Sequence, residues 1–192
     1  MKIKLNKLEL KTFTNQDALD YCQINNINPD SIIIIYLNHN ELTDISGIKL
    51  FKNLKKLDLS YNKIKDISVL KDLINLKELN LINNQITNIN ILKNLNKLKI
   101  LYIGFNKIVN ISVLKNLIYL QELYINNNKI KNLSVIQYLV NIKILSLINL
   151  KLESNQIKYI NSCKNLKKLL CNNGFKDMDI TDKLDKNIRI IK

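Results

Sequence analysis

Apolar residues recur along this chain with a period of 22 residues. Each unit repeats one spelling, in which a short alternating stretch is followed by apolar residues at every third position. The unit that starts at residue 54 has its apolar residues at Leu54, Leu57, Leu59, Ile64, Ile67, Leu70 and Leu73, with Asn62 between the two halves. The later units start at Leu76, Leu98, Leu120 and Ile142. Alternation is typical of a β-strand and a three-residue period is typical of a 3₁₀ turn, so each unit predicts one strand and one short return segment.

A single unit of this kind cannot bury its apolar side alone, so neighbouring units are expected to stack into a solenoid. The pattern predicts an α/β fold with a curved parallel β-sheet on the concave face and short 3₁₀ or irregular segments on the convex face. The spelling Leu-x-x-Leu-x-Leu-x-x-Asn resembles the 22-residue leucine-rich repeat found in internalins and in a leucine-rich regulatory subunit of protein phosphatase 1. The resemblance is close over residues 32–141 and looser over residues 142–175. It implies a leucine-rich repeat solenoid and does not identify a partner.

The whole chain, residues 1–192, is predicted to form a single leucine-rich repeat domain. Residues 1–31 are expected to form a helical N-terminal capping unit. Residues 32–165 are expected to hold six repeats, the last of them irregular. Residues 166–192 are expected to supply a final strand unit and a C-terminal cap.

Both end units depart from the common spelling. At the N-terminus, Leu5 opens a copy of the strand half, Phe13 takes the asparagine place, and a helix is expected to begin at Thr14 and to be stopped by Pro29. Near the C-terminus, the spacing predicts a five-residue insertion within residues 149–154 and a three-residue deletion later in the same coil. A final strand is expected among Ile188, Ile190 and Ile191.

Two polar columns run through the repeats. The first is Asn40, Asn62, Asn84, Asn106 and Asn128. We expect these amides to be buried at the end of each strand, where they satisfy turning backbone. The second is Ser46, Ser68, Asn90, Ser112 and Ser134. We expect these side chains to cap the first free amides of each convex segment.

The residues that carry chemistry are few. His39 is the one histidine, and Cys22, Cys163 and Cys171 are scattered in a way that predicts buried, reduced thiols. No metal site, cofactor or nucleophile arrangement is expected, and the acidic residues are too spread to form a catalytic pair, so an enzyme is not predicted. No apolar run approaches the roughly 20 residues needed to cross a bilayer. The first residues lack the apolar core of a signal peptide, so we expect an intracellular, cytoplasmic protein, unlike the exported internalins.

The chain has 30 Lys and Arg against 16 Asp and Glu, a net charge of +14. The lysines fall in three columns. They are Lys55, Lys77, Lys99 and Lys143 at the strand edge, Lys63, Lys107 and Lys129 in the following loop, and Lys49, Lys71, Lys93 and Lys115 on the convex side. Binding of nucleic acid or of an anionic surface through these lysine ladders is therefore one hypothesis, although the centre of the concave sheet carries acidic residues.

The repeat leaves free the strand residues that alternate with the core, together with the two residues after each strand. The candidate partner-binding residues are Tyr36, His39, Asp58, Tyr61, Glu78, Ile82, Ile100, Tyr102, Phe105, Glu122 and Tyr124. Exposed aromatic residues rimmed by polar groups are typical of protein contact surfaces. The leading interpretation is a non-enzymatic module that binds an unidentified protein on its concave face. Nucleic-acid binding and a purely structural role remain open alternatives.

Overall fold

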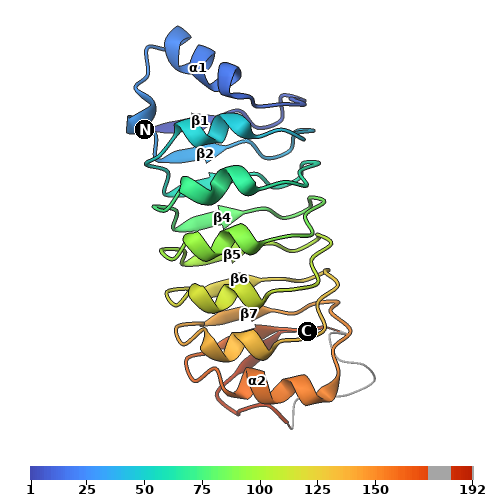
Figure 1. Ribbon diagram of the computed structural model, residues 1–192. Helices are drawn as coiled ribbons and strands as arrows, with labels where there is room; N and C mark the ends of the chain where they lie inside the picture. Colours follow the sequence, from blue (N-terminus) through green and yellow to red (C-terminus); the bar gives the residue numbers. More distant parts are fainter. Residues whose placement is uncertain (173–182, 192) are drawn as a thin grey trace.

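The computed structural model describes residues 1–172 and 183–191, and within them the chain winds into a stack of coils (Figure 1). One edge of every coil is a three-residue strand, and all strands pair in parallel and in chain order into one nine-stranded sheet over the described residues. The strands are β1 Lys2–Lys4, β2 Ile34–Tyr36, β3 Lys56–Asp58, β4 Glu78–Asn80, β5 Ile100–Tyr102, β6 Glu122–Tyr124, β7 Ile144–Ser146, β8 Lys168–Leu170 and β9 Arg189–Ile191. The predicted α/β repeat solenoid is confirmed.

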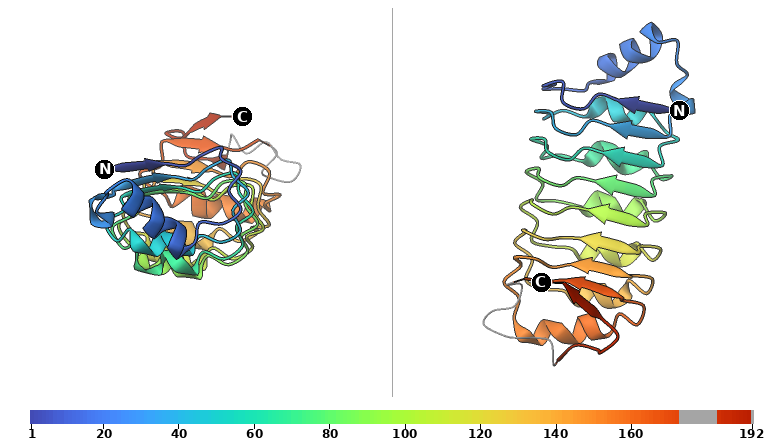
Figure 2. Two further views of the ribbon diagram at one scale, coloured as in Figure 1. Left: turned by 90° about the horizontal axis from the view of Figure 1, so that it is seen from above. Right: turned by 180° about the vertical axis from the view of Figure 1, so that it is seen from behind.

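The return segments lie on the opposite side of the stack from the sheet (Figure 2). They are the 3₁₀ helices η2 Ser46–Leu50, η3 Ser68–Asp72, η4 Asn90–Asn94, η5 Ser112–Asn116 and η6 Ser134–Tyr138. Each strand is offset from the next by 22 residues from β2 to β7, so that Leu57, Leu79 and Leu101 lie side by side. The sheet and the return segments enclose one continuous core.

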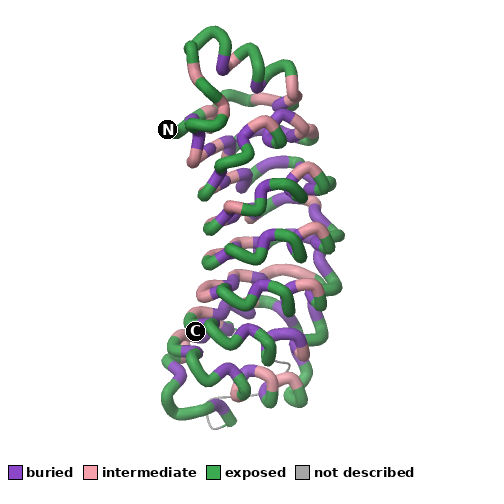
Figure 3. Tube along the Cα trace, turned by 60° about the vertical axis from the view of Figure 1, so that its left-hand side comes forward, coloured by how far each residue is buried: buried purple, intermediate pink, exposed green. Residues whose placement is uncertain are grey.

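The core is built from the repeated apolar positions. Strand residues such as Leu79 and Leu101 and return-segment residues such as Ile67 and Leu70 are at most 2% exposed. Figure 3 shows the burial recurring at the same place in coil after coil. Full burial of one such side chain contributes roughly 1.5–3 kcal/mol, so the stacking of identical positions accounts for much of the driving force for folding.

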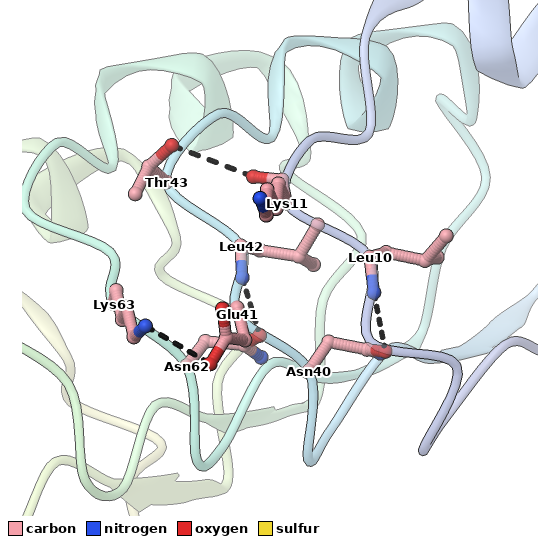
Figure 4. Close-up of polar contacts among 8 residues, drawn as sticks. All are labelled: Leu10, Lys11, Asn40, Glu41, Leu42, Thr43, Asn62 and Lys63. Carbon is pink, nitrogen blue, oxygen red and sulfur yellow. Dashed lines mark hydrogen bonds and ion pairs between the residues drawn. The ribbon is translucent and has the colours of Figure 1, made fainter.

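The first asparagine column bonds each coil to the coil before it. The Asn62 side-chain amide donates to the carbonyl oxygens of Leu37 and Leu59, each at 3.0 Å. The Asn62 Oδ1 accepts from the backbone N–H of Leu42 at 3.0 Å (Figure 4). Four of the five asparagines are buried and Asn128 is half-buried. The prediction that these amides satisfy the backbone at the strand ends is confirmed.

The prediction for the second polar column is wrong. The 3₁₀ helices η2 to η6 have no side-chain cap at the residue before them. Instead the acceptor lies two residues before the amide, as where Asp44 Oδ1 accepts from the Ser46 N–H at 2.7 Å and Asn110 Oδ1 from the Ser112 N–H at 2.8 Å. A short side-chain acceptor reaches an amide two residues on, which is the geometry of an Asx turn.

The N-terminal helix is shorter than predicted. Helix α1 spans Asn15–Ile24 and is followed by a 3₁₀ turn, η1 Pro29–Ser31. Thr14 and Asp17 form the expected capping box, with the Asp17 N–H donating to Thr14 Oγ1 and the Thr14 N–H to Asp17 Oδ2. The helix ends at Ile24, before Pro29, because the Asn25 amide side chain satisfies the Tyr21 carbonyl. Helix α1 packs on η2 and lies over the first coil (Figures 1 and 2).

The predicted strand of the N-terminal unit is out of register. Ile3 pairs with Ile35, an offset of 32 residues, where the sequence reading that began at Leu5 gave 27. The asparagine place therefore falls on Leu8, whose backbone N–H donates to Asn40 Oδ1 at 2.9 Å. Phe13 instead enters the core and stacks on Phe51, with ring centroids 6.3 Å apart. Assignment of residues 1–31 as a cap stays a prediction.

The irregular C-terminal coil also differs from its prediction. Strand β8 is offset from β7 by 24 residues. The spelling does not resume at Ile157 beside Ile130, because Ile157 lies in a short helix, α2 Ile157–Asn161, that packs on η6. The 3₁₀ turn η7 Ser154–Gln156 leads into α2, so two extra residues are absorbed by helix in place of a large insertion and a deletion. Strand β9 confirms the expected final strand. Residues 173–182 and 192 of the predicted C-terminal cap lie outside the described residues.

Candidate functional site

The candidate site is the outward side of the nine-stranded sheet, which we call the sheet face, together with the rim, the column of residues three positions after each strand. Seven predicted binding residues lie on the strands. They are Tyr36, Asp58, Glu78, Ile100, Tyr102, Glu122 and Tyr124. Each is half-buried, as expected for side chains that alternate with core leucines along a strand. His39, Tyr61 and Phe105 belong to the rim, and Ile82 lies two residues after β4.

The centre of the sheet face is a pair of stacked tyrosines. Tyr102 and Tyr124 face each other on neighbouring strands with ring centroids 4.6 Å apart and planes at 19°. The Tyr124 hydroxyl donates to Glu122 Oε2 at 3.0 Å. Burial and then the Glu122 carboxylate raise the pKa of both hydroxyl groups above the ordinary value. The two tyrosines are therefore neutral at physiological pH and present an aromatic surface with polar edges.

Charged groups toward the N-terminal end of the sheet face are engaged with one another. Lys56 pairs with Glu78 at 2.7 Å, and the hydrogen bond to Glu78 raises the pKa of Lys56. The Lys56 and Lys2 ammonium groups lie 5.8 Å and 5.3 Å from the ring centroid of Tyr36. Asp58 accepts from the backbone and the hydroxyl of Ser60. These contacts hold the side chains in place, and they leave no pair of carboxylates arranged for proton transfer.

The rim is built on left-handed backbone. Its residues are His39, Tyr61, Asn83, Phe105, Asn127 and Asn149, all with φ between 53° and 58°. Asparagine adopts this conformation readily, whereas a bulky residue in it costs roughly 1–2 kcal/mol. Yet Tyr61 and Phe105 are 46% and 51% exposed, so they gain little from burial. His39 and Tyr61 stack at 4.2 Å, and Phe105 lies between two asparagines in the column.

The ends of the sheet face are basic and its centre is acidic. The basic residues are Lys2 and Lys4 on β1, Lys168 on β8 and Arg189 on β9. The acidic residues are Asp58, Glu78 and Glu122 on β3, β4 and β6. Sequence reasoning missed the basic ends, because the N-terminal unit was placed five residues out of register and the last two strands were not followed. The correct signal was the alternation of Ile3 and Leu5 with Lys2 and Lys4.

Within the residues that the structure describes, no group of three His, Cys, Asp or Glu side chains could hold a metal ion. All three cysteines are buried, and Cys22 and Cys163 are free thiols. In the same part of the chain, no helix has the length and apolar character of a membrane span. The arrangement of the sheet face suits noncovalent contact through aromatic, apolar and hydrogen-bonding groups.

The sequence was compared with families and with curated proteins. Residues 30–72 and 74–116 match the family described as leucine rich repeats in two copies. No curated protein is significantly similar in sequence.

Solved structures with this architecture come from bacterial proteins. Internalin C2 of Listeria monocytogenes is 26% identical with a TM-score of 0.83, and the match covers 98% of this chain and 78% of that one. Internalin F of the same organism is 28% identical with a TM-score of 0.78, over 84% of this chain and 47% of that one. A leucine-rich repeat protein of Leptospira interrogans is 26% identical with a TM-score of 0.77, over 96% and 46%. The chain thus spans about half the length of two of these three proteins.

Proposed function

Since this chain is a leucine-rich repeat protein, we propose that it is a non-enzymatic module that binds a protein partner on its sheet face. Leucine-rich repeats generally serve as protein-interaction modules. The sheet face offers a continuous surface of half-buried side chains across the described strands. A rigid stack of coils keeps that surface in one shape, which lowers the entropy lost on binding.

The observation that carries this proposal is the exposure of aromatic residues where folding does not require them. Tyr61 and Phe105 occupy left-handed backbone that asparagine fills elsewhere in the column. Tyr102 and Tyr124 add a stacked pair beside them on the sheet. Tyrosine and other aromatic anchors supply much of the binding energy at protein interfaces. Strain retained at exposed positions favours a binding role for these residues.

Binding of nucleic acid or an anionic surface is the second candidate. It is supported by the exposure of the lysine columns at both edges of the sheet and by the basic residues at its two ends. The acidic centre, with Glu78 and Glu122, opposes a phosphate backbone lying across the sheet face. Such a ligand would therefore have to follow one edge of the solenoid.

Affinity capture from the native cell, followed by titration of each purified captured protein, tests the proposal. The double variant Tyr102→Ala/Tyr124→Ala should weaken binding by at least about 2 kcal/mol, because each anchor can contribute that much. The matched control is Tyr119→Ala/Tyr138→Ala, which removes two exposed tyrosines away from the sheet. Folding of each variant is checked by circular dichroism.

A Lys63→Gln/Lys107→Gln/Lys129→Gln variant separates the two candidates. Rim charges steer association more than they hold a protein complex, so this variant should mainly slow the on-rate. The proposal fails if the double tyrosine variant binds unchanged while the triple lysine variant loses binding. A binding constant that falls steeply with salt would then support nucleic acid.

We further propose an intracellular setting, in which the buried thiols of Cys22 and Cys163 stay reduced. Fractionation of the native cell, with detection of the protein in each fraction, tests this location. Recovery outside the cell would contradict it.

A further inference from the structure

The asparagine column stops at residue 150, and the backbone hydrogen bonds that it serves stop with it. In the preceding coils, one backbone N–H donates to the Oδ1 of the next asparagine at 3.0 Å. The donors are Leu42, Ile64, Ile86 and Ile108, and the acceptors are Asn62, Asn84, Asn106 and Asn128. The next donor in the series is the Ile130 N–H, and the next acceptor position is Leu150, which has no polar atom in its side chain.

A second series of hydrogen bonds ends at the same place. Backbone N–H groups one residue after each asparagine donate to carbonyl oxygens of the preceding coil at 2.8 to 3.0 Å. The pairs are Lys63 with Leu42, Gln85 with Ile64, Lys107 with Ile86 and Lys129 with Ile108. The next pair would be Lys151 with Ile130, but Lys151 has a φ of 34° and does not make this bond. Among the described residues, neither the Ile130 N–H nor the Lys151 N–H has an acceptor.

A pocket of about 370 Å³ opens where these bonds are missing. Its lining consists of two stretches from neighbouring coils, residues 128–131 and 149–151. Ile130 and Leu150 are buried and make it apolar at the base, and Lys129, Lys131 and Lys151 are exposed around it. None of the seven residues that line this described pocket is acidic.

We propose that this pocket, between the loop of Asn128–Lys131 and the loop of Asn149–Lys151, binds a phosphate monoester. Backbone N–H groups left without acceptors beside cationic side chains form a site for an oxyanion. Lysine serves as a point charge for phosphate, and three lysines match a dianion better than a singly charged carboxylate. The volume is at the lower end of the range for small-molecule sites, so it accepts a phosphate group with a small substituent.

The site is separate from the proposed protein-binding surface, since none of the lining residues belongs to a strand. It exists because the coil that follows β7 replaces the ladder asparagine with leucine and absorbs two extra residues. In the preceding coils, the same place is closed by the two series of hydrogen bonds.

Isothermal titration of the intact protein at constant ionic strength tests the proposal. The probes are inorganic phosphate, glycerol 3-phosphate, a blocked Gly-phosphoserine-Gly tripeptide, and acetate. We expect saturable binding of all three phosphates and none of acetate. The tighter of the two esters distinguishes a small metabolite from a phosphorylated residue as the source of the group.

Two variants should remove this binding by different routes. Lys129→Gln/Lys131→Gln/Lys151→Gln removes the charge, and Leu150→Asn restores the ladder acceptor for the Ile130 N–H and closes the pocket. Each should weaken phosphate binding by about tenfold or more. Lys71→Gln/Lys93→Gln/Lys115→Gln, on the convex side, removes the same charge elsewhere and should leave binding unchanged.

Three results would overturn the proposal. They are absence of saturable phosphate binding, an equal loss in the convex-side triple variant, and binding of acetate as tight as that of phosphate. The lysine substitutions are on the surface and preserve the fold, so a failure of Leu150→Asn to fold would leave the charge variant to decide.

Discussion

The coils up to Asn128 and the coil that follows β7 share their strands and core but differ in their polar ladder. In the first region, each asparagine joins its own coil to the coil before it with side-chain hydrogen bonds. In the second, Leu150 stands in the ladder position, yet Leu145 and Leu147 remain fully buried and β7 still pairs with β8. The comparison shows that strand pairing and apolar stacking continue without the ladder. The ladder instead fixes the path of the loop that follows each strand.

The largest expected effect tests whether the two regions share one core. Leu101→Ala in the regular part and Leu145→Ala in the irregular part should each lower the free energy of unfolding by about 2–5 kcal/mol, because both leave a cavity at a fully buried site. Lys93→Ala on the convex surface is the control and should change it by less than about 0.5 kcal/mol. Urea unfolding measures all three. A much smaller cost at Leu145 would mean that the core is looser in the second region.

The second prediction exchanges the ladder residues between the regions. Asn84→Leu copies the substitution that the chain carries at position 150, and it leaves the carbonyls of Leu59 and Leu81 and the N–H of Ile64 buried without this partner. We expect a loss of about 2–4 kcal/mol, since each unpaired buried group is costly. The reverse change, Leu150→Asn, should alter stability by less than about 1 kcal/mol, because a lost apolar contact is offset by a gained hydrogen bond. Equal losses in both variants would contradict the assigned role of the ladder.

The third prediction concerns pH. Cys163 occupies the place that leucine holds at Leu95, Leu117 and Leu139, and burial raises the pKa of its thiol from 9 to about 11. Because the folded pKa lies above the unfolded one, the stabilisation is complete below pH 9 and is lost as the pH rises through 11. The advantage of the wild-type protein over Cys163→Ala should therefore shrink by about 1 kcal/mol between pH 7 and pH 10. Urea midpoints of both proteins at the two pH values measure it, and a constant difference would show that the thiol ionises freely.

The smallest expected effect is at the rim. Phe105→Asn should raise the free energy of unfolding by up to about 1 kcal/mol, because asparagine accepts the left-handed backbone more readily than a bulky residue does. Tyr61→Asn should gain less, since it also loses the stacking on His39. Both variants should bind the protein partner more weakly. If Phe105→Asn instead destabilises the fold, the aromatic ring has a structural role and the argument from strain is lost.

The sequence predicted the regular coils well because each residue there has one structural duty. Spacing alone placed Leu79 and Leu101 in the core and Tyr102 beside Tyr124, and the structure confirms both. The ladder role of Asn62 also followed, because a buried amide at a strand end has few other uses.

The end units were harder to predict, because their apolar residues fit more than one register. Leu5, Leu8 and Leu10 have the spacing of the strand half, but Ile3 and Leu5 are the residues that align with the next coil. The pocket could not be predicted either. It depends on the backbone of Lys151 and on a short helix, and spacing records neither of them.

The asparagine ladder also determines how the molecule unfolds. Each side chain from Asn62 to Asn128 is shared by two coils, so opening one coil breaks hydrogen bonds in its neighbour and the coils up to Asn128 open together. At Leu150 this coupling is missing. Native-state hydrogen exchange should therefore divide the protein at this position, with amides beyond β7 exchanging through a local opening that leaves the preceding coils intact.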